Sequence, residues 1–212
     1  MTKTTKERLL LAAVSEFAVS GYQATSVRNI LKRAGEKNLS AITYHFGSKE
    51  ALYKEVLDFM FRDAEKFKEE DGQPQIEALE VKVKLEGIIR FLCRAYYTIQ
   101  NTLDGELYQL FVREAGNPTP YFEEMVERHL KPTREYLCTL LREYLGPEVP
   151  QQVIDDCEYS ISGQILYGIL GQSIICKTHP ERVPFDEYVE QLSDHVVKFS
   201  MAGLEAFRPE KK

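Results

Sequence analysis

The spacing of apolar residues along the chain predicts helices from one end to the other. Near the N-terminus, apolar side chains recur every three or four residues, as on one face of a helix: Leu10, Ala13, Val14 and Phe17. Thr4 and Glu7 have the spacing of a capping box that begins this helix, and Gly21 is suited to end it. Apolar and polar residues do not alternate over any long stretch, so the pattern predicts an all-α fold.

Two shorter helices are expected next. Thr25 or Ser26 can cap the first of them, and Gly35 ends it. Asn38 can cap the second, which is expected to run from Leu39 to about His45. A tight, glycine-containing turn joins the two helices. This arrangement is typical of a helix-turn-helix unit, whose second helix can enter the major groove of DNA.

Longer helices are predicted over the rest of the chain, separated by breaks that contain glycine and proline. Ser48 can cap a fourth helix, which ends before the charged break at 69–75. Beyond this break, the apolar spacing predicts helices at about 76–101, 104–115, 121–130, 132–145, 151–177 and 185–207. Pro132 is expected to kink or separate two of them, because proline cannot donate a backbone hydrogen bond.

The charge of the chain is distributed unevenly. The 212 residues carry a formal net charge of −6. Residues 1–62 hold ten Lys and Arg against six Asp and Glu, so this part is net positive and the remainder is strongly acidic. A basic N-terminal part attached to an acidic body favours binding of a polyanion by that end of the protein.

Composition also limits the compartment and the chemistry. The chain has no run of about 18 uncharged apolar residues and no secretory signal, which predicts a cytoplasmic protein without a membrane span. The four cysteines have neither C-x-x-C spacing nor a histidine at metal-binding spacing, so we expect them to be buried thiols. No metal and no cofactor are predicted.

Two segments within residues 5–55 combine residues in a specific order: LLLAAVSEFAVSGYQATSVRNILKRAG and ITYHFGSKEALY. Together they resemble the DNA-binding domain of TetR-type transcriptional regulators, although from Ala34 to His45 this chain is one residue longer than the family's commonest pattern. A later segment, FVREAGNPTPYFEEMVERHLKP, is similar to one branch of the family's ligand-binding halves. The resemblance implies a helix-turn-helix DNA-binding domain at 1–48. The fourth helix, from about residue 49, would join it to a ligand-binding and dimerisation domain at 49–212.

The resemblance implies two kinds of DNA contact. Phosphate contacts, which orient the protein on the duplex without reading its sequence, are expected from Thr25, Ser26, Arg28, Tyr44, His45 and Lys49. Base contacts are expected from the third helix, through Asn38, Ser40, Ala41 and Thr43. These side chains are small, so we expect thymine methyl contacts and single hydrogen bonds rather than bidentate arginine readout. Without the resemblance, an aromatic–histidine pair is more often core or plain surface, and a lone lysine is usually a solvated charge.

Two stripes in the last helices imply, through the resemblance, a homodimer with a four-helix interface. In the 151–177 helix, small residues share one face, which lets another helix approach closely. The interface residues expected there are Gly163, Tyr167 and Gly171, and those expected in the last helix are Leu192, Val196 and Phe199. The alternative is that both stripes only close the core of one subunit.

The middle helices are rich in aromatic residues. Rings with a few hydroxyls suit an apolar or amphipathic small molecule, and the residues expected to line such an effector site are Phe91, Tyr96, Tyr108, Phe111, Tyr136 and Tyr159. For any one of these residues, ordinary core packing is the alternative. Arg94, Arg113 and Glu114 also fall in apolar helices, where an unpaired charge is costly. One of them could anchor an anionic group, but structural pairing of Arg113 with a glutamate of a neighbouring helix is the favoured interpretation.

The sequence therefore predicts a ligand-responsive transcriptional repressor. It would bind a near-palindromic double-stranded DNA operator as a homodimer and be released by a small apolar or amphipathic effector. An all-α enzyme is the first alternative, but no H-E-x-x-H, G-x-S-x-G or phosphate-loop motif supports it. A helical interaction module that does not bind DNA is the second. Activation instead of repression also stays open, because the sign of regulation depends on where the operator lies.

Overall fold

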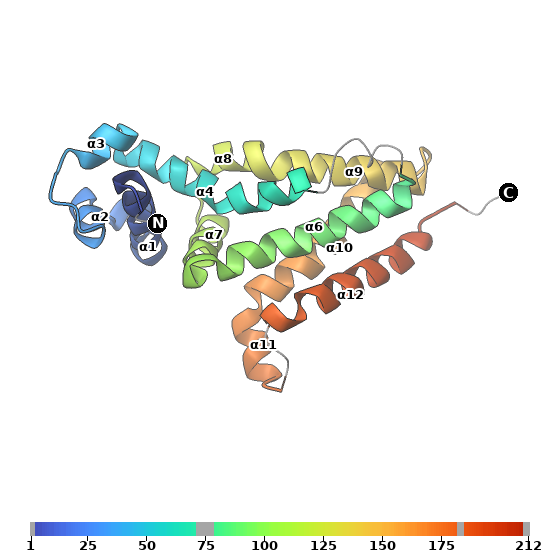
Figure 1. Cartoon of the computed structure of the whole chain (residues 1–212). Helices are drawn as coiled ribbons and strands as arrows, with labels where there is room; N and C mark the ends of the chain where they lie inside the picture. The colour runs from blue at the N-terminus through green and yellow to red at the C-terminus, as the bar shows by residue number, and fades with distance from the viewer. Residues whose placement is uncertain (1–2, 71–78, 182–184, 210–212) are drawn as a thin grey trace. The chain divides into compact units, whose positions relative to one another are not determined.

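The computed structural model of the protein describes residues 3–70, 79–181 and 185–209, and within these ranges all regular structure is helical (Figure 1). The predicted all-α fold is confirmed. None of the helices in the described ranges is both long enough and apolar enough to cross a membrane. The predicted helix at 76–101 is α6, Val81–Asn101; its expected first residues, 76–78, lie outside the described residues.

The first helix, α1 (Thr5–Ala24), begins with the predicted capping box. The backbone N–H of Glu7 donates to the Thr4 hydroxyl at 3.2 Å, and the backbone N–H of Thr4 donates to the Glu7 carboxylate at 2.7 Å. Gly21 interrupts the helix with φ 73° and ψ 172°, a conformation that glycine adopts without the strain of a side chain. One further helical turn then continues to Ala24.

The helix-turn-helix unit consists of α2 (Val27–Arg33) and α3 (Ala41–Phe46). Ser26 caps α2, since its hydroxyl accepts the N–H of Asn29 at 3.1 Å. The predicted start of α3 at Leu39 is wrong by two residues. The Asn38 side chain accepts the N–H of Ser40 at 2.9 Å, and this local turn delays the helix until Ala41.

The fourth helix, α4 (Lys49–Glu70), begins as predicted, with the Ser48 hydroxyl accepting the N–H of Ala51 at 3.0 Å. The chain divides into two compact units. Unit 1 contains Met1–Asp63 and Ile99–Arg128, and unit 2 contains Ala64–Thr98 and His129–Lys212. The sequence predicted a domain boundary between residues 48 and 49. The two compact units do not follow this boundary, so it stays a prediction about how function is divided along the chain.

Unit 1 combines the N-terminal helices with α7 (Glu106–Gly116) and α8 (Phe122–Met125). Figure 1 shows α7 beside α1, which are in extensive contact. A left-handed turn precedes α7: Leu103, Asp104 and Gly105 all have positive φ. Buried residues from the whole unit form its core, among them Leu9, Val14, Phe17, Ile30, Ile42, Leu52, Tyr53 and Leu110.

Between α8 and α9 (Lys131–Leu145) the chain forms one π-helical turn, Val126–Leu130. This turn ends two residues before Pro132, which lacks the N–H that a regular α-helix would need at that point. The sequence predicted that Pro132 would kink or separate two helices. The structure confirms a disruption there, in the form of a π-helical turn between two α-helices.

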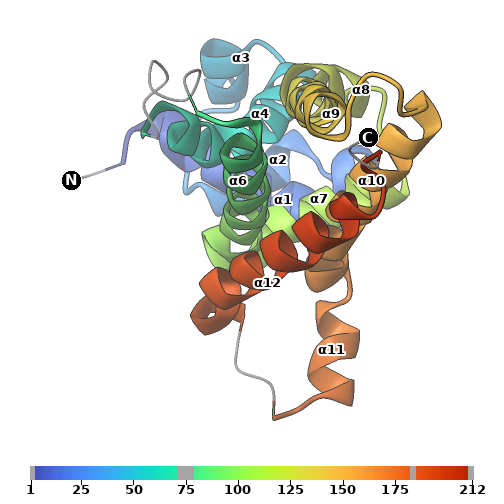
Figure 2. The same cartoon turned by 90° about the vertical axis from the view of Figure 1, so that its right-hand side faces the viewer.

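The predicted helix at 151–177 is wrong as a single element. The structure has two helices there, α10 (Gln151–Leu170) and α11 (Gln172–Thr178), with a break at Gly171. Gly171 packs so closely on the preceding turn that a Cβ atom would lie 2.6 Å from the carbonyl oxygen of Tyr167. The last helix, α12 (Phe185–Glu205), runs beside α10 within unit 2 (Figures 1 and 2).

Candidate nucleic-acid interface

The outer side of α3, with its N-cap residue Ser40, carries four of the ten residues expected to contact DNA. Tyr44 is 83% exposed, and its ring meets the His45 ring edge to face with 4.8 Å between the ring centroids. Ser40 and Thr43 are exposed as well. Because these side chains project from one short helix, they can approach a duplex together, with the polar tips of Tyr44 and His45 available to phosphate oxygens.

Two of the predicted DNA contacts are wrong, because the structure buries their side chains. Thr25 is 2% exposed, and its hydroxyl donates to the carbonyl oxygens of Gly21, at 2.8 Å, and Glu16, at 3.0 Å. It therefore closes the end of α1. Ala41 is 5% exposed and packs in the core beside Ile42. Each of the two residues lies on the inner side of its segment, which residue type alone did not reveal.

The start of α2 is exposed, and its phosphate contacts stay a prediction. Ser26 and Arg28 are both exposed. The Ser26 hydroxyl accepts from the backbone in the cap, so its own proton can still be donated to an anion. The free N–H groups of the first turn and the positive end of the helix dipole favour an anion at the same place. Asn38 is exposed, but its carboxamide oxygen is occupied by the N–H of Ser40.

Lys49, at the start of α4, is held by an aromatic ring that the sequence analysis did not single out. Its ammonium group lies 4.4 Å from the centroid of the Tyr22 ring, which is within the range of a cation–π interaction. Partial burial lowers the pKa of Lys49 from its usual value. Tyr22 directly follows Gly21, the glycine predicted to end the first helix. This position beside the glycine is the sequence feature that could have identified Tyr22. The phosphate contact of Lys49 stays a prediction.

The residues expected to line an effector site divide between the two units. Tyr108 and Phe111 belong to unit 1, where Phe111 is buried and its ring lies 6.5 Å from that of Phe61. Phe91 and Tyr96 belong to unit 2 and are half-buried. Burial raises the pKa of the Tyr96 hydroxyl to about 12, and the nearby Glu158 carboxylate adds to this effect. The remaining two, Tyr136 and Tyr159, are exposed on unit 2 and contribute no interior surface.

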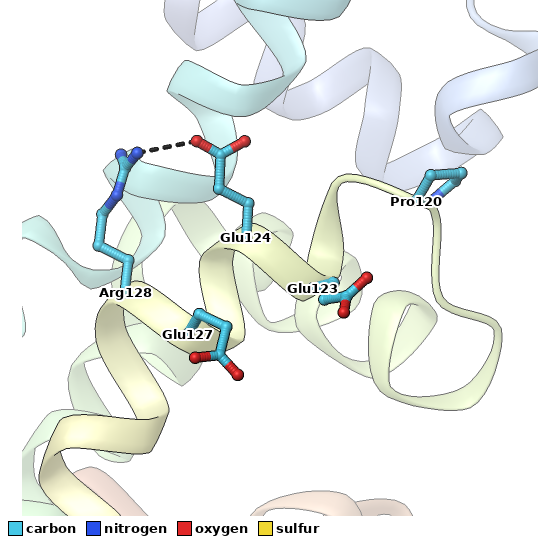
Figure 3. Close-up of a pocket in the computed structure, with 5 residues that line it drawn as sticks. All are labelled: Pro120, Glu123, Glu124, Glu127 and Arg128. Carbon is cyan, nitrogen blue, oxygen red and sulfur yellow. Dashed lines mark hydrogen bonds and ion pairs between the residues drawn. The ribbon is translucent and has the colours of Figure 1, made fainter.

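A hollow in unit 1 has a different character from the expected effector site. It is open to solvent and is lined by Pro120, Glu123, Glu124, Glu127 and Arg128 (Figure 3). Arg128 pairs with Glu124 at 2.9 Å and with Asp58 of α4 at 2.7 Å. With three glutamates and no aromatic ring, this surface does not suit an apolar molecule.

The residues expected at a dimer interface are partly exposed and partly buried. Tyr167 and Phe199 are 60% and 62% exposed, and Gly163 is exposed with open space around it. Leu192 is half-buried. Val196 and Gly171 are buried within unit 2, so their expected place on the interface is wrong: they close the core of one subunit.

The three charged residues of the middle helices all have structural partners. Arg94 forms two hydrogen bonds of 3.0 Å with the carboxylate of Glu190 in α12. Contrary to the interpretation from the sequence, no glutamate among the described residues pairs with Arg113. Its guanidinium donates to the carbonyl oxygens of Ala18, at 3.3 Å, and Val19, at 2.9 Å. Glu114 is buried, and the hydroxyl of Tyr53 donates to it at 2.5 Å.

Two family models match this architecture. Residues 9–56 match the model described as bacterial regulatory proteins, tetR family. Residues 81–204 match the C-terminal domain of the HTH-type transcriptional dual regulator CecR. The chain is also 30% identical over 202 residues to the HTH-type transcriptional dual regulator CecR of Shigella flexneri, an alignment that covers 91% of this chain and 87% of that protein.

Solved structures with the same fold are more distant in sequence. HlyIIR, a hemolysin II transcriptional regulator, is 20% identical with a TM-score of 0.54, over 90% of this chain and 96% of that one. The transcriptional regulator FadR from Bacillus subtilis, in complex with stearoyl-CoA, is 17% identical with a TM-score of 0.60, over 90% of this chain and 97% of that one.

The helix-turn-helix unit with its exposed third helix and the larger helical body define a DNA-binding transcriptional regulator, not an enzyme. The chain belongs to the TetR family of bacterial transcriptional regulators, with a C-terminal domain of the CecR type.

Proposed function

We propose that the protein is a homodimeric repressor that leaves a near-palindromic operator when a small apolar or amphipathic effector binds. The observation that carries the DNA-binding part is the exposed side of α3, where Ser40, Thr43 and Tyr44 project together. Ser26 and Arg28 before α3 in the chain, and Lys49 after it, would add phosphate contacts. In a cell such a protein would work in the cytoplasm, where its operator lies.

The dimer is supported by an exposed apolar stripe on unit 2. Along α10, Tyr159, Gly163 and Tyr167 are spaced by four residues, so they share one face, and all three are exposed. Leu170 extends this stripe, and Phe199 adds a ring on the adjacent α12. Large exposed rings grouped in this way favour burial against a second copy, with Gly163 permitting close approach.

Two observations support an apolar or amphipathic effector: aromatic rings in this chain, and a ligand complex of a protein with the same fold. The half-buried rings of Phe91 and Tyr96 lie in α6 of unit 2. The same fold binds an amphipathic thioester in the complex of FadR with stearoyl-CoA. An effector releases DNA only if it binds the DNA-free arrangement more tightly than the DNA-bound one.

The experiment is a gel shift with DNA from upstream of the protein's own gene, repeated with acyl-CoA thioesters, free fatty acids and uncharged aromatic compounds. We expect a specific shift that one of these classes reverses at a concentration that also raises Tm. Transcription from the same fragment in vitro then gives the sign of regulation. The similar protein of Shigella flexneri is named a dual regulator. If the protein activates transcription at some promoters, dual regulation would replace the proposal of simple repression. A shift that responds only to hydrophilic cations would contradict the effector class.

A further inference from the structure

Glu114 is a buried carboxylate with neutral partners. It is 1% exposed, and its two oxygens accept three hydrogen bonds. The Tyr53 hydroxyl donates to one oxygen at 2.5 Å, while the N–H and hydroxyl of Thr119 donate to the other at 3.0 and 2.8 Å. Burying a charge is costly, and an apolar residue of similar size is often as stable there. The three directed bonds therefore suggest that Glu114 fixes an arrangement of helices.

Arg113, the preceding residue, holds a different helix. It reaches the carbonyl oxygens of Ala18 and Val19, which lie just before the interruption of α1. Such terminal carbonyls lack helical donors, and a cation suits the negative end of the helix dipole. The approach is close at Gly21: a Cβ atom there would lie 3.2 Å from the guanidinium nitrogen Nη1, so the guanidinium would have to shift.

Adjacent residues of a helix project about 100° apart, so α7 can hold two neighbours at once. Arg113 holds α1, and Glu114 holds α4 through Tyr53. The Tyr53 ring is fully buried and meets the Phe17 ring of α1 edge to face at 4.7 Å. The polar bond to Glu114 therefore acts at the contact between α1 and α4.

The same set of contacts extends to a predicted phosphate contact. The segment that Glu114 holds through Thr119 also carries Tyr121, whose hydroxyl donates to that of Tyr22 at 3.3 Å. The rings of Tyr121 and Tyr22 meet with 5.0 Å between centroids, and Tyr22 lies under the ammonium group of Lys49. Every residue of this path belongs to unit 1.

We propose that Arg113 and Glu114 are positioning residues for DNA binding, which hold α1 and α4 so that α3 and Lys49 fit the duplex together. The proposal rests on DNA binding by this chain and adds a requirement from α7, a helix remote in sequence from the helix-turn-helix unit. DNA contacts tolerate displacements of only about 0.5 Å, so small rotations of α4 are enough to weaken them.

The test uses the full-length protein and a duplex that the wild type selects from a random-sequence pool, with a scrambled duplex of equal length. Glu114→Leu keeps the volume and removes all three bonds. We expect it to bind the selected duplex about tenfold more weakly, the equivalent of one lost hydrogen bond to a charged group. Affinity for the scrambled duplex should stay within about twofold, because charge alone governs that binding.

Two further variants separate positioning from folding. Glu114→Gln should retain affinity within about threefold, since its oxygen can accept from Thr119 and its amide can donate to the Tyr53 hydroxyl. The matched control is Glu158→Leu, which removes another buried carboxylate, one that accepts from Arg134 and Ser162 in unit 2. It should leave affinity for the selected duplex within about twofold, at a similar loss of Tm.

The outcomes are distinct. If Glu114→Leu binds the selected duplex as tightly as the wild type does, the proposal is overturned. It is also overturned if the variant loses affinity for both duplexes equally, because that result indicates reduced folding. If Glu114→Leu is unfolded at the assay temperature, Tyr53→Phe decides, because it removes one hydroxyl and keeps the ring. A wild type that selects no duplex contradicts DNA binding itself.

Discussion

The ammonium group of Lys49 lies over the ring of Tyr22, 4.4 Å from its centroid, at the N-terminus of α4. The contact restrains a long side chain that would otherwise sample many rotamers. A cation held in this way loses less conformational entropy when it meets a phosphate.

Lys49→Ala should therefore weaken binding to all duplexes nearly alike and reduce the slope of log affinity against log salt by about one unit. Tyr22→Leu should lower affinity about threefold, the equivalent of a weak cation–π contact, without changing the slope. Fluorescence anisotropy at several salt concentrations measures both. Lys54→Ala is the control, because Lys54 already pairs with Glu124 at 3.0 Å. Equal slopes for Lys49→Ala and the wild type would remove Lys49 from the phosphate contacts.

Gly21→Ala should lower the free energy of unfolding by about 1–3 kcal/mol. The position has φ 73°, and the added methyl group would meet the guanidinium of Arg113 at 3.2 Å. Gly87→Ala is the matched control in α6, where a methyl group meets open space and should stabilise the helix by up to about 1 kcal/mol. Urea unfolding of the two variants measures the difference, and equal stabilities would contradict the role assigned to Gly21.

Phe199→Glu should convert the proposed homodimer into a monomer, because the charge would be buried against the second copy. Size-exclusion chromatography with light scattering at micromolar concentration is the measurement. Phe207→Glu changes another exposed ring, beyond the end of α12, and should leave the dimer intact. Gly171 is unsuitable for this purpose, since any side chain there clashes within its own subunit. A monomeric wild type would refute the proposed assembly.

The Arg94–Glu190 pair should stabilise the fold at neutral pH and lose its effect in acid. The hydrogen bonds from Arg94 lower the pKa of Glu190 below its ordinary value, with the charge of Arg94 adding to the effect. A lowered folded-state pKa gives stability that is present above the unfolded-state pKa and is lost as pH falls through the folded-state value.

The wild type should therefore exceed Glu190→Gln by about 0.5–1 kcal/mol in free energy of unfolding at pH 7, a value typical of an exposed pair. This difference should decline as pH falls below about 4, near the ordinary pKa of glutamate, and disappear below the lowered folded-state pKa. Urea titrations between pH 3 and 7 measure it. A difference that persists unchanged at pH 3 would mean that the pair does not act through ionised Glu190.

Features set by neighbouring residues could be predicted from the sequence. The capping box of Thr4 and Glu7, the caps at Ser26 and Ser48, and the interruption at Gly21 all depend on hydrogen bonds or backbone angles within a few residues. These local signals, together with apolar residues at helical spacing, were enough for the all-α fold and the helix-turn-helix unit. The resemblance then supplied the family, which the matching family models and the relative in Shigella flexneri confirm.

Only the tertiary structure decided which side of each helix is buried and which distant residues meet. Thr25, Ala41 and Val196 face inward, although their residue types allowed either side. Glu114 meets Tyr53 across 61 positions of the chain, and Arg113 meets Ala18 across 95. The physical reason is that burial and long-range hydrogen bonds depend on which remote segment packs against a helix, and helical spacing within one segment does not contain that information.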